Sequence, residues 1–407
     1  MQQIAKASAR GRAFAHIAQF HPELTAFRRD LHAHPELGFE EVYTSGRVQQ
    51  AMALCGVDEV FAGIGKTGVV AVVHGKTNTR NRMIALRADM DALPLQEHND
   101  TPWKSSKPGL MHACGHDGHT AMLVGAARYL AETRNFDGTA VLIFQPGEEG
   151  FAGARAMIQD GLFDQFPAQA VYAIHNSPET AVGVIGLTPG PMQAAVDRIE
   201  IVVTGKGGHG ARPQNGVDPV LVAAHIITAA QSIVSRNVAA IEQVVLSICS
   251  IHGGNPGAMS VIPGSVTLVG TVRTYHESMQ DKVESRLRAL CESIAAGFGA
   301  SAELNYERVY PATVNTIPET EFAANVAAKL VGESRVIRNM PPSMGGEDFS
   351  FMLQVVPGAY MRLGQGNVNG YMLHNSRYDF NDDVLPLGSA MYASLIEEAM
   401  PLVHKES

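Results

Sequence analysis

The 407-residue sequence predicts an α/β fold in which a mixed-sheet domain is interrupted by an inserted α+β domain. The N-terminal third alternates apolar strands with helices, which is typical of a sheet covered on both faces. The pattern changes near residue 193, where DRIEIVVTGKGG alternates apolar and polar residues. Such alternation indicates an antiparallel strand with one exposed face. Beyond this insertion, the alternation of helices and strands resumes and continues to the C-terminus.

The elements of the first part follow from periodicity and from bounded apolar runs. Helices are expected at 23–35, 40–55, 118–133 and 152–160, and strands at 68–74, 82–89, 139–144 and 170–175. The first twenty residues carry basic side chains but no continuous apolar core. They are therefore expected to form part of a helix and not a signal peptide.

The insertion is expected to contain one strand before a long helix, then two strands and a second helix. Its helices are predicted at 218–235 and 277–298, and its later strands at 242–252 and 265–274, with 301–316 returning as a strand. These elements predict an interrupted domain of residues 1–192 and 307–407, with the inserted domain at 193–306.

The net charge and the cysteine spacing indicate which partners and which cellular compartment to expect. The formal net charge of −9 argues against a nucleic-acid or anionic-membrane partner, because both require clustered basic residues. No stretch is expected to span a membrane. The four cysteines are widely scattered, which favours free thiols in a reducing cytoplasm over a disulfide framework.

Three predicted strands end in side chains of the kind that bind metals. In MIALRADMDALP, the strand ends at Asp89 and is followed by Asp91. In TAVLIFQPGEEG, the strand is followed by Glu148 and Glu149, and in AVYAIHNSP the strand ends at His175. Ligands of open α/β sheets collect at the carboxyl ends of strands. Three such strand ends therefore predict one shared site.

A fourth segment, MHACGHDGHT, brings His112, Cys114, His116 and His119 within eight residues. Imidazole and thiolate are preferred ligands of Zn²⁺ and similar ions. Taken singly, a histidine here could cap a helix and Cys114 could be a small buried core residue. Cys114 could also be a covalent nucleophile. The surplus of carboxylates and imidazoles favours a metal over these alternatives.

The Glu148-Glu149 pair is suited to two roles. Adjacent side chains point in different directions, so one carboxylate can bind a metal while its neighbour faces the substrate. A water activated by a metal needs a base within hydrogen-bond reach. The alternative is a solvated acidic pair at a turn.

Eight segments together resemble the M20 metallopeptidases. They resemble in particular the amidohydrolase branch, with its hippurate hydrolases, auxin-conjugate hydrolases and N-acetyl-diaminopimelate deacetylases. The segments are RRDLHAHPELGFEE, LRADMDALP, MHACGHDGHT, QPGEEG, GKGGHGARP, GTVRT, GGEDFSFM and LHNSRYDFND. The likeness covers nearly the whole chain, whereas any one motif alone would be weak.

The resemblance implies two divalent metal ions per subunit. Cys114 would bridge them, His116 and His175 would complete the ligands of one ion, and Glu149 and His374 those of the other. Such mixed ligands suit Zn²⁺, Mn²⁺, Co²⁺ or Ni²⁺.

The resemblance also implies roles in catalysis. Glu148 would be the general base, and His209 of the inserted domain would stabilise the oxyanion. Asp91 would be a supporting carboxylate near the base and the metal. The inserted domain would act as a lid and form a homodimer.

Two departures from the wider family stand out. Asp89-Met90-Asp91 replaces a common His-x-Asp pair, which fits the Cys-containing amidohydrolase branch and argues against a carboxypeptidase. Ser376 stands where a proline is expected after His374.

The activity implied is metal-dependent hydrolysis of the amide bond of N-acyl amino acids. Three alternatives stay open: an aminoacylase or dipeptidase on the same fold, a non-catalytic metal- or ligand-binding protein, and a thiol hydrolase using Cys114. His32 and His34 are assigned a structural or substrate-pocket role, not ligation.

Overall fold

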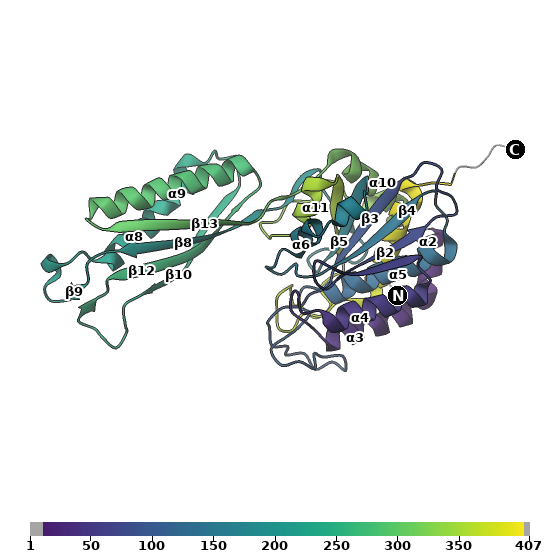
Figure 1. Ribbon diagram of the computed structural model, residues 1–407, viewed down its shortest axis with the longest axis horizontal. Helices are drawn as coiled ribbons and strands as arrows, with labels where there is room; N and C mark the ends of the chain where they lie inside the picture. The colour runs from purple at the N-terminus through teal and green to yellow at the C-terminus, as the bar shows by residue number, and fades with distance from the viewer. Residues whose placement is uncertain (1–10, 403–407) are drawn as a thin grey trace. The chain divides into compact units, whose positions relative to one another are not determined.

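The computed structural model describes residues 11–402, shown in Figure 1. The described residues divide into two compact units. The first unit combines three stretches of chain, up to Met192, Val314–Pro341, and from Asp348 onward. The inserted unit combines Gln193–Thr313 with the short return Pro342–Glu347.

Within residues 11–402, the first unit is built on an eight-stranded mixed sheet. Its order is β1 (Glu59–Ile64), β2 (Gly68–His74), β4 (Thr139–Gln145), β3 (Met83–Asp89), β5 (Ala170–Ser177), β16 (Gly358–Gly364), β6 (Ile185–Gly186), β15 (Val336–Ile337). The central strands β4, β3, β5 and β16 run parallel to their neighbours in this group. Consequently their carboxyl ends meet at one edge of the sheet.

Both faces of this sheet are buried. In β2, Val69, Ala71 and Val73 belong to one apolar cluster, while Val70 and Val72 belong to another. This alternation is the two-residue period of a strand whose two sides both face a core. The buried strand runs that the sequence shows therefore arise because helices cover both faces.

The helices form two layers, as Figure 1 shows. The larger apolar cluster is completed by α2 (Arg12–Ile17), α3 (His21–Ala33), α4 (Val42–Cys55), α5 (His116–Thr133), α10 (Ile317–Val331) and α12 (Leu385–Ala399). The smaller cluster is completed by α6 (Gly153–Gln159), α7 (Leu162–Gln165) and α11 (Phe349–Val355). A two-stranded ladder joins β7 (Gly190–Gln193) to β14 (Thr313–Asn315).

Among the described residues, the inserted unit has a four-stranded antiparallel sheet. Its order is β10 (Val244–Gly253), β12 (Ser265–Thr274), β8 (Ala195–Thr204), β13 (Ser301–Tyr310). Helices α8 (Pro219–Ser232) and α9 (Glu277–Gly297) cover one face and share its apolar cluster. In β8, Ile199 and Ile201 are buried while Arg198 is exposed, which is the alternation expected of a half-covered sheet.

One helical stretch corrects the expectation that no segment could span a membrane. Pro219–Asn237 comprises α8 and the π-helical turn after it. By length and composition alone, this stretch is long and apolar enough to cross a membrane. Its Val222, Ile226 and Ile233 are buried against the sheet of the inserted unit. This packing explains the apolar composition, as in the core helix of a globular domain.

The α/β class with an inserted α+β unit is confirmed, and the differences are local. Strand 301–316 is interrupted after Tyr310, where Pro311 lacks the amide hydrogen that a ladder needs. The expected boundary after residue 306 falls inside β13. β1 was missed because its residues are mostly exposed, so it carries no apolar run. The expected N-terminal helix is present over Arg12–Ile17, and residues 1–10 lie outside the described part.

Candidate metal centre

The sequence-predicted ligands of the first unit lie at one edge of its sheet. Cys114 precedes α5, and His116 is the first residue of that helix. Glu149 follows β4, His175 lies near the end of β5, and His374 lies in the loop after β16. Because β4, β3 and β5 are parallel neighbours, their carboxyl ends bring these loops together.

The five residues form two groups of three that share Cys114. One group is Cys114, His116 and His175, and the other is Cys114, Glu149 and His374. Within each group the potential ligand atoms lie within 4.8 Å of one another. Cys114 Sγ is 3.4 Å from His175 Nε2, and His374 Nε2 is 3.2 Å from Glu149 Oε1. A shared sulfur with two flanking groups is the geometry that two neighbouring ions require.

His374 is held in a strained backbone conformation. Its φ is +61°, in the left-handed region that non-glycine residues seldom occupy. Its backbone N–H donates to Ala113 O at 2.8 Å, which ties it to the segment that carries Cys114. Strain of this kind is typical of functional positions, where the surrounding structure holds a residue in place.

Asp91 contacts both the candidate ligand His116 and the Glu148-Glu149 pair. His116 Nδ1 lies 2.9 Å from Asp91 O and 3.2 Å from Asp91 Oδ1. The Asp91 carboxylate also accepts the backbone N–H groups of Glu148 at 3.0 Å and Glu149 at 2.8 Å. A donor hydrogen at Nδ1 leaves the Nε2 lone pair of His116 available for a metal.

The donor set fits divalent metal ions. His116 Nε2 is buried and has no hydrogen-bond partner among the described residues. A buried polar atom without a partner is costly, and a metal ion would satisfy it. The thiolate, imidazole and carboxylate donors suit Zn²⁺ and similar ions.

His119 lies beside the ligands but is occupied by hydrogen bonds. Its Nδ1 is 2.6 Å from Asp89 Oδ1, and its Nε2 is 2.7 Å from Asn176 Oδ1. Asp89 also accepts from Arg87 Nη1 at 2.8 Å. Asp89 and His119 could form a further ligand group with His116. Their short mutual bonds instead suit the role of orienting the neighbouring imidazoles.

The surroundings of the site disfavour a free thiolate. Burial, followed by the charge of Glu149, raises the pKa of Cys114. A hydrogen bond with Cys114, followed by one with Glu149, raises the pKa of His374 to about 10. The cluster of anionic donors therefore stabilises positive charge at this place. That property fits cation binding better than it fits a thiol nucleophile, which works as a thiolate.

Other predicted residues are not members of the ligand groups. His209 belongs to the inserted unit, where it is exposed on β9 (Gly208–His209), paired with β11 (Val261–Ile262). His32 is buried, with Nδ1 2.8 Å from Asp117 Oδ2, so its role is structural. His112 is buried but joins none of the ligand groups found in residues 11–402.

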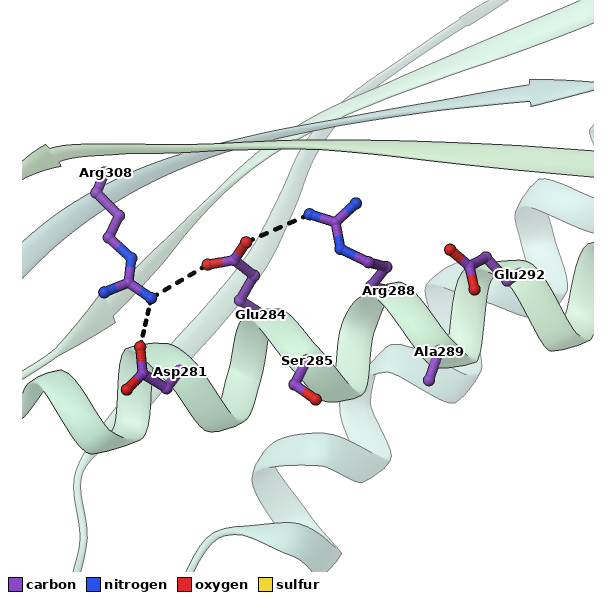
Figure 2. Close-up of a pocket in the computed structure, with 7 residues that line it drawn as sticks. All are labelled: Asp281, Glu284, Ser285, Arg288, Ala289, Glu292 and Arg308. Atoms are coloured by element: carbon purple, nitrogen blue, oxygen red, sulfur yellow. Dashed lines mark hydrogen bonds and ion pairs between the residues drawn. The ribbon is translucent and has the colours of Figure 1, made fainter.

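A surface hollow of about 400 Å³ on α9 of the inserted unit is lined mostly by charged side chains (Figure 2). Arg308 Nη2 lies 2.5 Å from Asp281 Oδ1 and 3.2 Å from Glu284 Oε2. Arg288 Nη2 donates to the other oxygen of Glu284 at 3.3 Å. Asp281 and Glu284 thus pair with the two arginines, and Glu292 is a third carboxylate in the lining.

Two buried polar residues of the first unit were missed from the sequence. Asn176 links His119 to the Tyr378 hydroxyl, to which its Nδ2 donates at 2.6 Å. Glu41 accepts the backbone N–H of Gly147, just before the catalytic pair, at 2.8 Å. Glu41 stands in the RRDLHAHPELGFEE segment, but nothing in that motif points to a residue beyond position 140.

The family model for peptidase family M20/M25/M40 matches residues 85–398. The chain is 42% identical to the hippurate hydrolase of Campylobacter jejuni, over 93% of this chain and 97% of that protein. It is 38% identical to an N-acetylcysteine deacetylase of Bacillus subtilis, over 92% and 96% of the two chains. It is also 38% identical to thermostable carboxypeptidase 2 of Saccharolobus solfataricus, over 90% and 93%.

A solved structure agrees with these relatives. The fold matches that of a dinuclear metal-binding peptidase of the M20 family from Bacillus subtilis with a TM-score of 0.81. The two chains are 34% identical, and the match covers 94% of this chain and 99% of that one. The chain therefore belongs to peptidase family M20/M25/M40, in its amidohydrolase branch, and is a metal-dependent amidohydrolase.

Proposed function

We propose that this enzyme hydrolyses the amide bond of N-acyl amino acids, releasing a carboxylate and a free amino acid. The observation that carries the proposal is the pair of ligand groups sharing Cys114, with Glu148 beside them. His116 and His175 would hold one ion with Cys114, and Glu149 and His374 would hold the other. The names of the hippurate hydrolase and the N-acetylcysteine deacetylase support an acyl amino acid as substrate.

Two divalent cations bound there would supply Lewis-acid activation of water and of the scissile carbonyl. Glu148 accepts a proton from the attacking water at its carboxylate and delivers it to the nitrogen of the leaving amino acid. We assign His209 the donation of a hydrogen bond to the carbonyl oxygen as negative charge develops there. Zn²⁺, Mn²⁺, Co²⁺ and Ni²⁺ all suit the mixed donor set.

Asp91 positions this machinery and does not touch the substrate in the scheme. Its carboxylate accepts hydrogen bonds from the backbone N–H groups of Glu148 and Glu149, and it also contacts the His116 ring. Held in this way, Glu149 can face a metal while Glu148 faces the reacting water. The free thiols, with no disulfide among the four cysteines, support a reducing compartment such as the cytoplasm.

The competing functions differ in a measurable way. An aminoacylase or dipeptidase on the same fold is supported by the thermostable carboxypeptidase relative. A non-catalytic binding protein has no need of Glu148, a buried carboxylate beside the half-buried Glu149. A thiol hydrolase is disfavoured by the burial that raises the pKa of Cys114.

A substrate panel tests the proposal. Protein reconstituted separately with each of the four metals is assayed on hippurate, N-acetyl amino acids, indole-acetyl amino acids and unmodified dipeptides. We expect acyl amino acids to be cleaved with a higher kcat/KM than dipeptides, and a chelator to abolish turnover. Faster cleavage of dipeptides would favour the peptidase alternative, and activity that resists chelation but not alkylation would favour the thiol hydrolase.

A further inference from the structure

Three successive backbone amides before and within the catalytic pair each donate to a buried carboxylate. Gly147 N donates to Glu41 Oε1 at 2.8 Å. Glu148 N and Glu149 N donate to the two oxygens of Asp91, at 3.0 and 2.8 Å. The loop that carries the base and a ligand is therefore held by two carboxylates, which come from different parts of the chain. Asp91 has a role in the scheme above, whereas Glu41 has none.

Glu41 is built into this position. Its side chain is fully buried, and its second oxygen accepts the Thr67 hydroxyl at 2.5 Å. Burial, followed by the charge of Asp91, raises the pKa of Glu41 to about 7. Burying a carboxyl group is unfavourable unless its oxygens are hydrogen-bonded, and both oxygens of Glu41 have a partner. These two hydrogen bonds fix the position of the Glu41 side chain. One of its two partners is the residue next to the proposed base.

The segment before Glu41 packs directly on the same loop. A side chain on Gly38 would approach within 2.9 Å of the Gly147 Cα atom and collide with the Phe151 ring. Phe39 adopts a left-handed φ of +67° and meets Phe151 edge to face, with ring centroids 5.9 Å apart. A strained residue between two close contacts indicates that residues 38–41 are held against the loop at 147–151.

We propose that Glu41 is a positioning residue of this amidohydrolase. Through the amide of Gly147, it sets the direction in which Glu148 and Glu149 leave β4. The inference rests on the proposed function in one respect, since it takes Glu148 as the base and Glu149 as a ligand. Partners that orient metal ligands change metal affinity or activity by about 10- to 100-fold when they are removed.

The first test compares Glu41→Ala with Glu40→Ala, a matched variant of an exposed neighbour. Metal affinity is measured by competition with a chromogenic chelator, which resolves two binding steps. In Glu41→Ala, we expect the step that depends on Glu149 and His374 to lose affinity by about 10- to 100-fold, while the step that depends on His116 and His175 changes little. We also expect kcat to fall with little change in KM, because the base is displaced. Glu40→Ala should match the wild type in all of these measurements.

Two conservative variants separate positioning from a general structural role. Glu41→Gln keeps an oxygen for the Gly147 amide, and it should restore most of the metal affinity and kcat. Thr67→Val removes only the hydroxyl donor to Glu41, so its effect should be smaller than that of Glu41→Ala. If Glu41→Ala fails to fold, Glu41→Met takes its place, because it keeps much of the side-chain bulk but offers no oxygen to the Gly147 amide. Lower metal affinity and kcat in Glu41→Met than in Glu41→Gln would support the proposal, and equal values in the two variants would overturn it.

Contrary outcomes are distinct. Wild-type metal affinity and kcat in Glu41→Ala would overturn the proposal. So would equal weakening of both binding steps, together with a lowered Tm of the metal-free protein and no rescue by Glu41→Gln. If the wild-type enzyme cleaves no acyl amino acid, the proposed substrate class fails, but the two metal-binding steps still test Glu41.

Discussion

Glu148 and Glu149 are adjacent, yet their surroundings differ. Glu149 belongs to a ligand group with Cys114 and His374 that does not include Glu148, although both carboxylates share a further group with His116. Glu148 Oε1 also accepts the backbone N–H of Asp348 at 3.4 Å. Both amides are held by Asp91, so the two carboxylates cannot simply exchange places. These differences support the proposal that Glu148 transfers the proton and Glu149 binds a metal.

Glu148→Gln should keep the metal content of the wild type and lose most of its turnover. The amide has nearly the same shape but cannot accept a proton, and general-base catalysis contributes about 10²- to 10⁴-fold. Metal content is measured by elemental analysis, and kcat on the best substrate of the panel. Glu149→Gln is the matched variant and should lose metal as well as activity. Unchanged turnover in a fully loaded Glu148→Gln enzyme would remove Glu148 from the mechanism.

Cys114→Ser should weaken the binding of both ions. The sulfur is the one atom common to the two ligand groups, and a serine hydroxyl is a poor ligand at neutral pH. The check is a metal titration of Cys114→Ser beside Cys291→Ser, which alters a buried thiol of the inserted unit. Full stoichiometry and affinity in the first variant would show that Cys114 does not bridge.

At the scale of elements, α3 anchors the start of α5, which carries His116. Arg28 of α3 is fully buried, and its Nη1 donates to Asp117 Oδ2 at 3.3 Å. The same guanidinium makes two bonds to Asp382, at 2.7 and 3.1 Å. A buried cation among several carboxylates ties three distant segments to one another, with the first turn of α5 between them.

Arg28→Met should lower the free energy of unfolding by about 3–5 kcal/mol, because it leaves buried carboxylates without their cation. Denaturant unfolding of the metal-free protein measures this change. Arg29→Met is the matched variant, since Arg29 also bonds to Asp382, at 2.8 Å, but its side chain is 38% exposed. Its loss should be about 1 kcal/mol, from a solvated ion pair and the stacking on Trp103. Equal losses in the two variants would contradict the argument from burial.

At the scale of the whole molecule, the proposed catalytic residues come from both units. The five candidate ligands and Glu148 belong to the first unit, and His209 belongs to the inserted unit. The edge strand β10 of the inserted sheet pairs on one side only, with β12, within the described chain. Exposed edges of this length tend to be covered or paired, and we predict a homodimer formed through the inserted unit.

His209→Ala should lower kcat by about 10²- to 10³-fold, the effect of losing one oxyanion donor, without changing metal content. His276→Ala, which changes an exposed histidine of the same unit outside β10, is the matched variant and should be fully active. Mixing the inactive Glu148→Gln and His209→Ala proteins tests whether His209 serves the partner's site, since activity then returns only in the mixture. Sedimentation of the wild type tests whether the protein is a dimer. If His209→Ala is fully active, the inserted unit has no catalytic role and serves only in assembly.

Local sequence was sufficient for most of the long helices and buried strands and for the donor types. Buried strands such as β4 and β5 are apolar along their whole length, and α5 repeats apolar residues at helical spacing. Ligand chemistry is also local, because thiol, imidazole and carboxylate groups keep their preferences in any fold. That β4 and β5 would deliver Glu149 and His175 to one place followed from the rule for parallel strands.

Contacts between distant residues were decided by the tertiary structure alone. The bond between Glu41 and the Gly147 amide spans 106 positions, and that between Arg28 and Asp382 spans 354. Neither leaves a periodic signal, because a buried polar side chain is specified by its partner and not by its neighbours in sequence. The left-handed conformation of His374 likewise depends on the segment that its amide contacts. Sequence therefore determined which groups are candidates for the chemistry, while packing across the fold decided which distant residues hold them in position.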